Sequence, residues 1–313
     1  MRLVSQVQTL FVAAAAKGSV RGAGRGAAVR KLAARGVSGG AAALLGTHPV
    51  LQSAKVFGSA NLLGLGISLA TGSHAHVDLV GTGAFVAAAF ATRGQSARQL
   101  ASTAMVAAWG TRLAAFLFYR ANRVGHDARL EQTLSTTSGA VGFWAISCAW
   151  GIVVMLPHTL GAAAVKAAPL GAGAAAAGVL YVAGLALEIC ADAQKWVFKG
   201  GASNRGKVCD AGVWGASQHP NWLGNLALWC GIFAINAPVL SLPALAAAAL
   251  SPVFLGALFL GQATGAVTNT VELADEKYAQ GPHAEAYHAY VETVPLLFAS
   301  PVSIIAAAFK RSA

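Results

Sequence analysis

The sequence has very few charged side chains. Only 11% of its residues are charged, whereas soluble domains carry about a quarter. Hydrophobic residues make up 56% of the chain, and the mean hydropathy is +0.59. A protein whose whole surface faces water needs more charge than this, so the composition excludes an ordinary soluble domain. It predicts instead an integral membrane protein whose partner is the lipid bilayer.

Acidic residues are missing from the N-terminal segment, where none precedes Asp78. The first 36 residues carry seven lysines and arginines amid alanine, glycine and serine. This composition is typical of an organelle transit peptide, and a disordered basic tail or a nucleic-acid arm is the alternative. The hydrophobicity of the rest of the chain argues against nucleic acid as a partner. We therefore expect residues 1–40 to lie outside the fold and residues 45–313 to form one membrane-embedded domain.

A transit peptide predicts the membrane of an organelle. Chloroplast and mitochondrion are not distinguished by this composition, and the endoplasmic reticulum is a further possibility.

The chain is poor in cysteine, and its thiols show no metal-binding pattern. The cysteines are Cys148, Cys190, Cys209 and Cys230. They have neither C-x-x-C spacing nor a neighbouring histidine pair, so no metal site or disulfide framework is expected. Gly22, Gly24 and Ala27 match the spacing of a dinucleotide fingerprint, but no strand precedes them and arginine interrupts them. We reject that match.

Long apolar runs follow one another with short polar gaps. A membrane-spanning helix needs about 20 mostly apolar residues, because each residue advances about 1.5 Å through hydrocarbon about 30 Å thick. Such runs lie near residues 53–71, 77–92, 99–119, 139–157, 169–190, 221–240 and 243–262. The second run is short, and the stretch 294–309 contains Pro301 and is expected at the membrane interface. The predicted fold class is an all-α polytopic transmembrane helical bundle of about six or seven spans.

Outside the basic N-terminal segment, the charged residues gather in three clusters. With seven spans, alternate crossings place the loop 120–138, the loop 191–220 and the tail after residue 262 on one side of the membrane. Basic residues predominate in these loops, so this side is expected to face the compartment from which the protein inserted.

The first cluster includes a stripe at helical spacing, formed by Arg112, Phe116, Tyr119 and Arg123. An arginine within a span is costly unless it faces a polar cavity or a partner. A snorkelling arginine near the end of the helix is the alternative for Arg112.

The second cluster begins with Glu188, Asp192, Lys195 and Lys199, whose spacing of four, three and four residues predicts one helical face. This stripe can form a salt-bridge network or line a ligand site. A polar loop follows and leads to Pro220.

Proline favours the first position of a helix, so His219 is the expected cap residue. The free backbone N–H groups of such a helix bind phosphate readily. With Lys199, Arg205 and Lys207 nearby, the loop predicts a site for a dinucleotide phosphate, and a solvated basic loop is the alternative.

The third cluster contains Glu272, Asp275, Glu276, Lys277, Tyr278, Tyr287 and Tyr290. A tyrosine beside a reducible bond can donate a proton, which makes Tyr287 and Tyr290 the candidate catalytic residues. Anchoring at the membrane interface is the commoner use of tyrosine.

One ordered series of residues carries a family resemblance. It comprises Glu188, Asp192, Gln194, Lys195, Asn204, Lys207, Gly212, Trp214, Ser217-Gln218-His219-Pro220-Asn221-Trp222 and Gly224, with Trp109, Arg112, Asp127 and Arg129 upstream and residues 272–293 downstream. The series resembles the C-terminal region of steroid 5-alpha-reductase-like membrane enzymes, which are related to sterol C=C reductases. The similarity covers roughly residues 75–300.

The resemblance implies an NADPH-dependent reductase of lipid metabolism that transfers hydride to a conjugated C=C bond. The substrate would be a steroid, an isoprenoid or another lipophilic enone. The resemblance and the basic loop together give the expected cofactor-binding residues: Arg112, Arg129, Lys195, Lys199, Asn204, Lys207, Trp214, Gln218, His219 and Asn221. Many relatives carry arginine at position 218 and glutamate at position 225, where this chain has Gln218 and Asn225. The N-terminal half that surrounds the steroid in the classical enzymes has no match here, so steroid specificity is not implied.

Two other functions fit parts of the pattern. Isoprenylcysteine carboxyl methyltransferases, which use S-adenosylmethionine, share a related His-Pro stretch before a helix. A non-catalytic membrane scaffold or a small transporter is the other alternative. Asn221 after Pro220, together with the stripe from Glu188 to Lys195, favours the reductase. A transporter would place polar residues along a path through the spans, whereas this chain collects its charges at one face.

Overall fold

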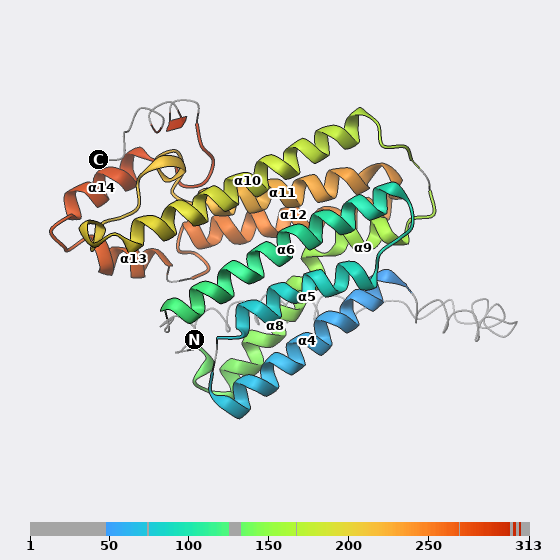
Figure 1. The fold of residues 1–313 in the computed structure, drawn as a ribbon, viewed down its shortest axis with the longest axis horizontal. Helices are drawn as coiled ribbons and strands as arrows, with labels where there is room; N and C mark the ends of the chain where they lie inside the picture. Colours follow the sequence, from blue (N-terminus) through green and yellow to red (C-terminus); the bar gives the residue numbers. More distant parts are fainter. Residues whose placement is uncertain are drawn as a thin grey trace, which may run out of the picture. The chain divides into compact units, whose positions relative to one another are not determined.

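The computed structural model describes residues 48–73, 75–124, 133–166, 168–268, 270–300, 303, 304 and 307. In this part of the chain all regular secondary structure is helical, and it falls into two compact units that divide between residues 167 and 168 (Figure 1). The expected transit segment 1–40 and the candidate residue Arg129 lie outside the described residues.

The first unit is built on an aromatic core. Its helices are α4 (Pro49–Thr71), α5 (Val77–Ala91), α6 (Ala97–Val124), α8 (Thr137–Val154) and α9 (Leu156–Ala163). Phe85 of α5 is fully buried and meets Phe57 of α4, Trp109 of α6 and Trp150 of α8 edge to face, at ring-centroid distances of 4.9, 5.2 and 5.1 Å. Aromatic rings prefer this geometry, so one side chain joins four helices.

A buried histidine links three elements of the first unit. His158 of α9 lies 2.9 Å from Ser102 Oγ of α6 through Nδ1, and 3.1 Å from Thr92 Oγ1 at the end of α5 through Nε2. Both ring nitrogens therefore have a partner, as a buried polar side chain requires. The apolar run 139–157 does not form one helix, because α8 ends at Val154 and α9 starts at Leu156.

The second unit contains three long helices and two short ones. The long helices are α10 (Ala172–Gly200), α11 (Pro220–Asn236) and α12 (Leu242–Ala263), and the short ones are α13 (Thr270–Tyr278) and α14 (Ala284–Thr293). The 3-10 turns η1 (Ala202–Asn204) and η2 (Gly212–Gly215) lie in the loop before α11, and η3 (Ala237–Val239) follows it. Within this unit α11 packs against both α10 and α12 (Figure 1).

Glycines allow α10 and α11 to approach each other closely. A Cβ atom on Gly184 would lie 2.5 Å from the backbone nitrogen of Leu228, and one on Gly224 would lie 2.6 Å from the carbonyl oxygen of Gly184. Gly231 meets the backbone of α10 in the same way, near Tyr181. Lipid gives membrane helices no hydrophobic drive to associate, so close backbone packing at small residues holds such pairs together.

Five helices of the described chain are long and apolar enough to cross a membrane: α6, α8, α10, α11 with η3, and α12. Helix α5 is apolar but has only 15 residues. Helix α4 has 23 residues, but Lys55 and its serines and asparagine dilute its hydrophobicity, and it is not among the five. The all-α polytopic membrane fold predicted from the sequence is confirmed. The assignment of the charged clusters to one side of the membrane stays a prediction.

Helix α10 runs ten residues beyond the expected end of its span at residue 190. Glu188, Asp192, Lys195 and Lys199 therefore lie on one continuous helix, as their spacing indicated.

The glycine contact predicts how α10 responds to a single methyl group. Gly184→Ala should destabilise the second unit by about 1–3 kcal/mol, because the new Cβ meets backbone atoms that cannot move independently. Gly178→Ala on the same helix is the matched control, since nothing lies within 4 Å of its Cβ position. Thermal unfolding in detergent measures both. Equal midpoints for the two variants would contradict the proposed close contact.

Candidate functional site

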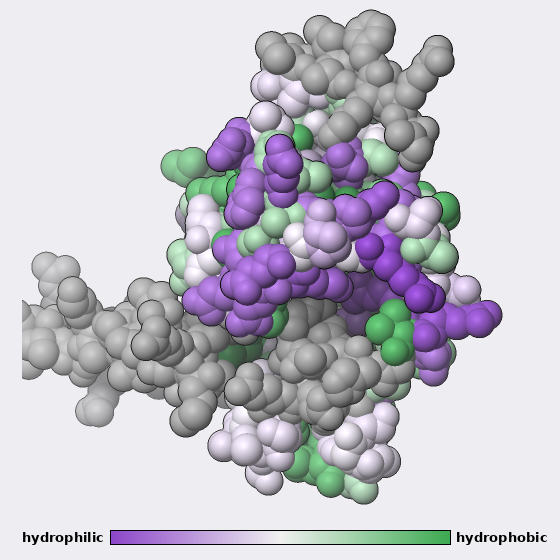
Figure 2. All heavy atoms as spheres, turned by 90° about the vertical axis from the view of Figure 1, so that its left-hand side faces the viewer, coloured by the Kyte–Doolittle hydropathy of each residue, from purple (hydrophilic) through white to green (hydrophobic). Residues whose placement is uncertain are grey.

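The polar residues of the second unit gather where α10 ends and α11 begins. The loop between these helices lies there together with α13 and α14 (Figure 1). Figure 2 views this end and shows hydrophilic side chains collected over it. Lys199 of α10 donates a hydrogen bond of 2.7 Å to Tyr278 Oη of α13, so the second and third charged clusters of the sequence meet in space.

Trp214 occupies the centre of this end. Its side chain is 3% exposed, and its Nε1–H donates to the carbonyl oxygen of Ala191 at 2.9 Å. Its own carbonyl oxygen accepts from Tyr290 Oη at 3.0 Å. The ammonium of Lys195 lies 4.0 Å from the centre of the Trp214 ring, within the range of a cation–π interaction. Trp214 thus joins α10, the loop and α14, and its ring lies against the ammonium of Lys195.

Helix α11 begins as its sequence predicts, with His219 as cap and Pro220 in the first turn. The backbone N–H groups of Asn221 and Trp222 lie in the first turn, where a helix offers no internal acceptor. The His219 ring stacks on Trp222 at 4.0 Å with an interplanar angle of 7°, and Trp222 in turn stacks on Phe259 of α12 at 5.7 Å. This aromatic stack holds the His219 imidazole beside the N-terminus of α11.

Burial and, to a smaller extent, the nearby positive charge of Lys195 together lower the pKa of His219 to about 4. At neutral pH the imidazole is therefore uncharged. It can donate one hydrogen bond and accept another.

Gln218 binds the end of α14 through both its side chain and its backbone. Its side-chain amide donates to the carbonyl oxygens of Val291 at 3.0 Å and Val294 at 2.7 Å. Its backbone N–H donates to the carbonyl oxygen of Pro295 at 2.9 Å. Both amide hydrogens thus satisfy the C-terminal end of α14, and Gln218 fastens that helix to the start of α11.

Two other candidate residues also brace the loop. Lys199 Nζ donates to the carbonyl oxygen of Lys207 at 2.8 Å as well as to Tyr278. Asn204 Nδ2 donates to the carbonyl oxygen of Phe198 at 3.0 Å, and so caps the end of α10. Gly212 has a φ of +58°, and the Gln194 side chain fills the space that a Cβ atom would need there.

The two candidate proton donors are buried, each with its hydroxyl engaged. Tyr287 Oη donates to Asp275 Oδ1 of α13 at 2.7 Å, whereas Tyr290 donates to the Trp214 carbonyl oxygen. Burial raises the pKa of both phenols, and the hydrogen bond and negative charge of Asp275 raise that of Tyr287 further. Both tyrosines therefore stay protonated at neutral pH.

A buried polar pair lies deeper along the same helices. Glu188 of α10 is 3% exposed, and its Oε2 accepts a hydrogen bond of 3.2 Å from Asn225 Nδ2 of α11. The spacing of the α10 stripe indicated Glu188 but not its partner. The pairing depends on the register of α10 against α11. Gly224 sets this register, because the backbone of α11 at Gly224 lies directly against the backbone of Glu188.

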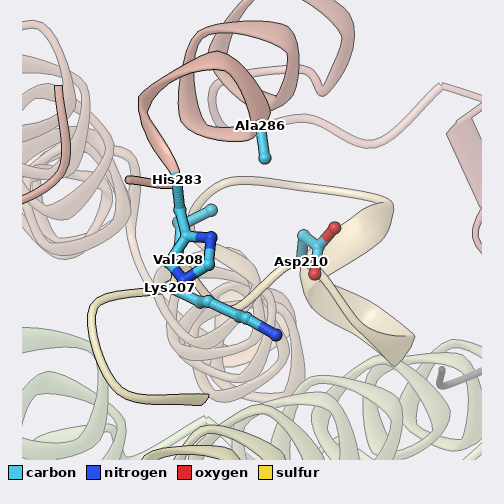
Figure 3. Close-up of a pocket in the computed structure, with 5 residues that line it drawn as sticks. All are labelled: Lys207, Val208, Asp210, His283 and Ala286. Carbon is cyan, nitrogen blue, oxygen red and sulfur yellow. The ribbon is translucent and has the colours of Figure 1, made fainter. Parts of the chain in front are cut away.

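A cavity of about 320 Å³ opens beside the loop in the second unit. It is lined by Lys207, Val208, Asp210, His283 and Ala286 (Figure 3). The Lys207, His283 and Asp210 side chains line the same space, from the loop and from the start of α14 (Figure 3). The sequence indicated Lys207. His283 was missed, because no spacing rule connects it with a loop more than 70 residues earlier.

The structure therefore brings eight of the ten expected cofactor residues to this end of the second unit. Of the other two, Arg129 lies outside the described residues. Arg112 lies in α6 of the first unit, with its guanidinium carbon 5.3 Å from the centre of the Phe116 ring.

A protein family matches most of the chain. The family described as "Protein of unknown function (DUF1295)" matches residues 65–294. The chain therefore belongs to this family of steroid 5-alpha-reductase-like proteins, whose description assigns no activity. No curated protein and no solved structure matches it.

The lowered pKa of His219 predicts a pH-dependent stability. The unfolded chain takes up a proton near pH 6.5 and the folded chain only near pH 4, so stability present above pH 6.5 is lost as the pH falls towards 4. His219→Gln should reduce the fall in unfolding midpoint between about pH 7.5 and about pH 5, measured by thermal unfolding in detergent. His288→Gln, at an exposed position of α14, is the matched control. An identical pH profile for His219→Gln and wild type would show that His219 is not buried in its neutral form.

Proposed function

We propose that the protein is a membrane-bound NADPH-dependent reductase that transfers hydride to a conjugated C=C bond of a lipophilic substrate. The site lies in the second unit, from Lys195 to Asn221, and α13 and α14 are hydrogen-bonded to this segment. One observation carries the proposal. The ammonium of Lys195 lies over Trp214 and close enough to His219, the cap of α11, to lower its pKa. The first turn of α11 adds backbone N–H donors, and the His219–Trp222 stack adds a flat aromatic surface.

The diphosphate of the nucleotide belongs at the start of α11. Phosphate binds the N-terminus of a helix because unpaired N–H groups and the helix dipole both favour negative charge. Lys195 adds a full positive charge, and Asn221 adds a side-chain amide in the same turn. Neutral His219 contributes a hydrogen bond to the phosphates but no charge.

Several candidate residues shape this site without touching the nucleotide. Lys199, Asn204 and Gln218 donate to backbone carbonyls, so they hold the loop and α14 in place. Their contribution is preorganisation, which spares the ligand the entropy cost of ordering the loop.

Hydride addition to an enone leaves a carbanion or enolate that must take up a proton. Tyr287 is the better donor of the two tyrosines. Its hydrogen-bond partner Asp275 is exposed, so the pair lies where a proton can arrive from solvent. Tyr290 donates to a backbone carbonyl, which cannot return one. We therefore assign Tyr287 the proton transfer and Tyr290 a supporting role for Trp214.

The nucleotide site predicts a loss of affinity when its polar groups at α11 are removed. The double variant His219→Ala with Asn221→Ala should bind NADPH more weakly by about 1–3 kcal/mol per lost contact, while the helices remain assembled. Calorimetry on the folded protein in detergent measures this affinity.

A matched control replaces the same residue types at exposed positions, with His288→Ala and Asn122→Ala. S-adenosylmethionine serves as the competing ligand. Unchanged NADPH affinity in the double variant would overturn the proposed site, and binding of S-adenosylmethionine in place of NADPH would favour a methyltransferase.

The assignment of the proton donor predicts different effects for the two tyrosines. Tyr287→Phe should slow reduction about 100-fold or more at unchanged NADPH affinity, because the proton source is lost. Tyr290→Phe should lower stability by about 1–3 kcal/mol, since the buried Trp214 carbonyl loses its donor. NADPH oxidation in the presence of a steroid enone or an isoprenoid enone in micelles gives the rates. A full rate for Tyr287→Phe would exclude this residue as the donor.

A further inference from the structure

The cavity beside Lys207 combines two bases with one acid. Lys207 and His283 offer hydrogen-bond donors, and Asp210 offers a carboxylate acceptor in the same space (Figure 3). Its volume of about 320 Å³ is at the lower end of the range of small-molecule sites. A simple anion would use the two donors and would be repelled by Asp210. The lining therefore fits a ligand that presents an anionic group to Lys207 and His283 and a hydrogen-bond donor to Asp210.

From this arrangement we infer that the cavity holds the 2′-phosphorylated ribose of the nucleotide and selects NADPH over NADH. The inference rests on the proposed function and names the part of the cofactor that this cavity reads. Lys207 and His283 bind the 2′-phosphate, and Asp210 accepts a hydrogen bond from the adjacent ribose hydroxyl. NADH has no phosphate at this position, so Lys207 and His283 would have no phosphate to bind.

The loop around the cavity is fixed from both sides. Gly206 has a φ of +76°, and the Cβ position at Gly206 lies 3.8 Å from His283 Cδ2. The carbonyl oxygen of Lys207 accepts from Lys199 Nζ, which holds its backbone against α10. The backbone is thus anchored to the helix while the Lys207 side chain lines the cavity (Figure 3).

The position of the cavity agrees with the rest of the proposed nucleotide site. Lys199 contacts the cavity loop, and Lys195, one helical turn earlier on α10, lies over Trp214. A nucleotide with its diphosphate at the start of α11 can therefore extend along α10 with its adenosine end towards Lys207. Lys195 lies near the diphosphate end of this path, and Lys199 holds the backbone of the cavity loop at the other end.

The experiment compares three probes, NADPH, NADH and 2′,5′-ADP, by calorimetry on the full-length protein in detergent. Wild type should bind NADPH more tightly than NADH. Lys207→Met and His283→Phe should each weaken NADPH and 2′,5′-ADP by about tenfold or more, because each removes a hydrogen bond to a charged phosphate. Their NADH affinity should stay at the wild-type value. Lys277→Met, at an exposed position of α13, is the matched control for loss of one positive charge.

Each outcome bears on the inference separately from the proposed function. Equal wild-type affinities for NADPH and NADH, or equal losses of both in the variants, would overturn the inference and leave the reductase proposal standing. Binding of 2′,5′-ADP that depends on Lys207, with no binding of either full dinucleotide, would support the phosphoribose site and overturn the reductase. No binding of any probe would overturn both.

Discussion

The close contact of α10 with α11 is the constraint on which the second unit depends. Gly184 and Gly224 bring the two backbones together, and no side chain can be added at either position without moving the helices. This register pairs Glu188 with Asn225 and aligns the polar stripe of α10 with the first turn of α11. Because the helices lack a hydrophobic drive in lipid, the geometry of the site follows from van der Waals contact at glycine.

Beyond this crossing, the end of the unit is held by hydrogen bonds to backbone carbonyls. Trp214, Gln218 and Asn204 each donate to a carbonyl oxygen of α10 or α14, and Tyr290 donates to Trp214. Buried carbonyls need such partners, so the loop adopts one conformation in which they are satisfied. These residues use their donors internally, so the proposed nucleotide contacts fall to the start of α11 and the cavity beside Lys207.

In the proposed function, this end of the second unit binds an anionic nucleotide. Lys195 lies over an aromatic ring, and burial keeps His219 uncharged. Of these two residues, Lys195 therefore carries the positive charge. Tyr287 remains protonated, because burial and its hydrogen bond to Asp275 raise the pKa of its phenol. Phosphate recognition and proton supply thus fall to different helices, with the phosphates at α11 and the proton at α13 and α14 in the proposed reaction.

The sequence by itself determined the helical membrane fold, the helical stripe from Glu188 to Lys199 and the start of α11 at Pro220. Each of these follows from local rules of apolar length, helical period and proline geometry, which need no knowledge of distant residues. The break between α8 and α9 also has a local cause, because Pro157 lies in the first turn of α9. The anchoring role of Gln218 and the approach of His283 to Lys207 were decided only by the tertiary structure. They depend on which backbone carbonyl groups lack a hydrogen-bond donor and on which helices can pack closely at glycine residues. Such contacts join residues far apart in the chain, so no spacing in the sequence records them.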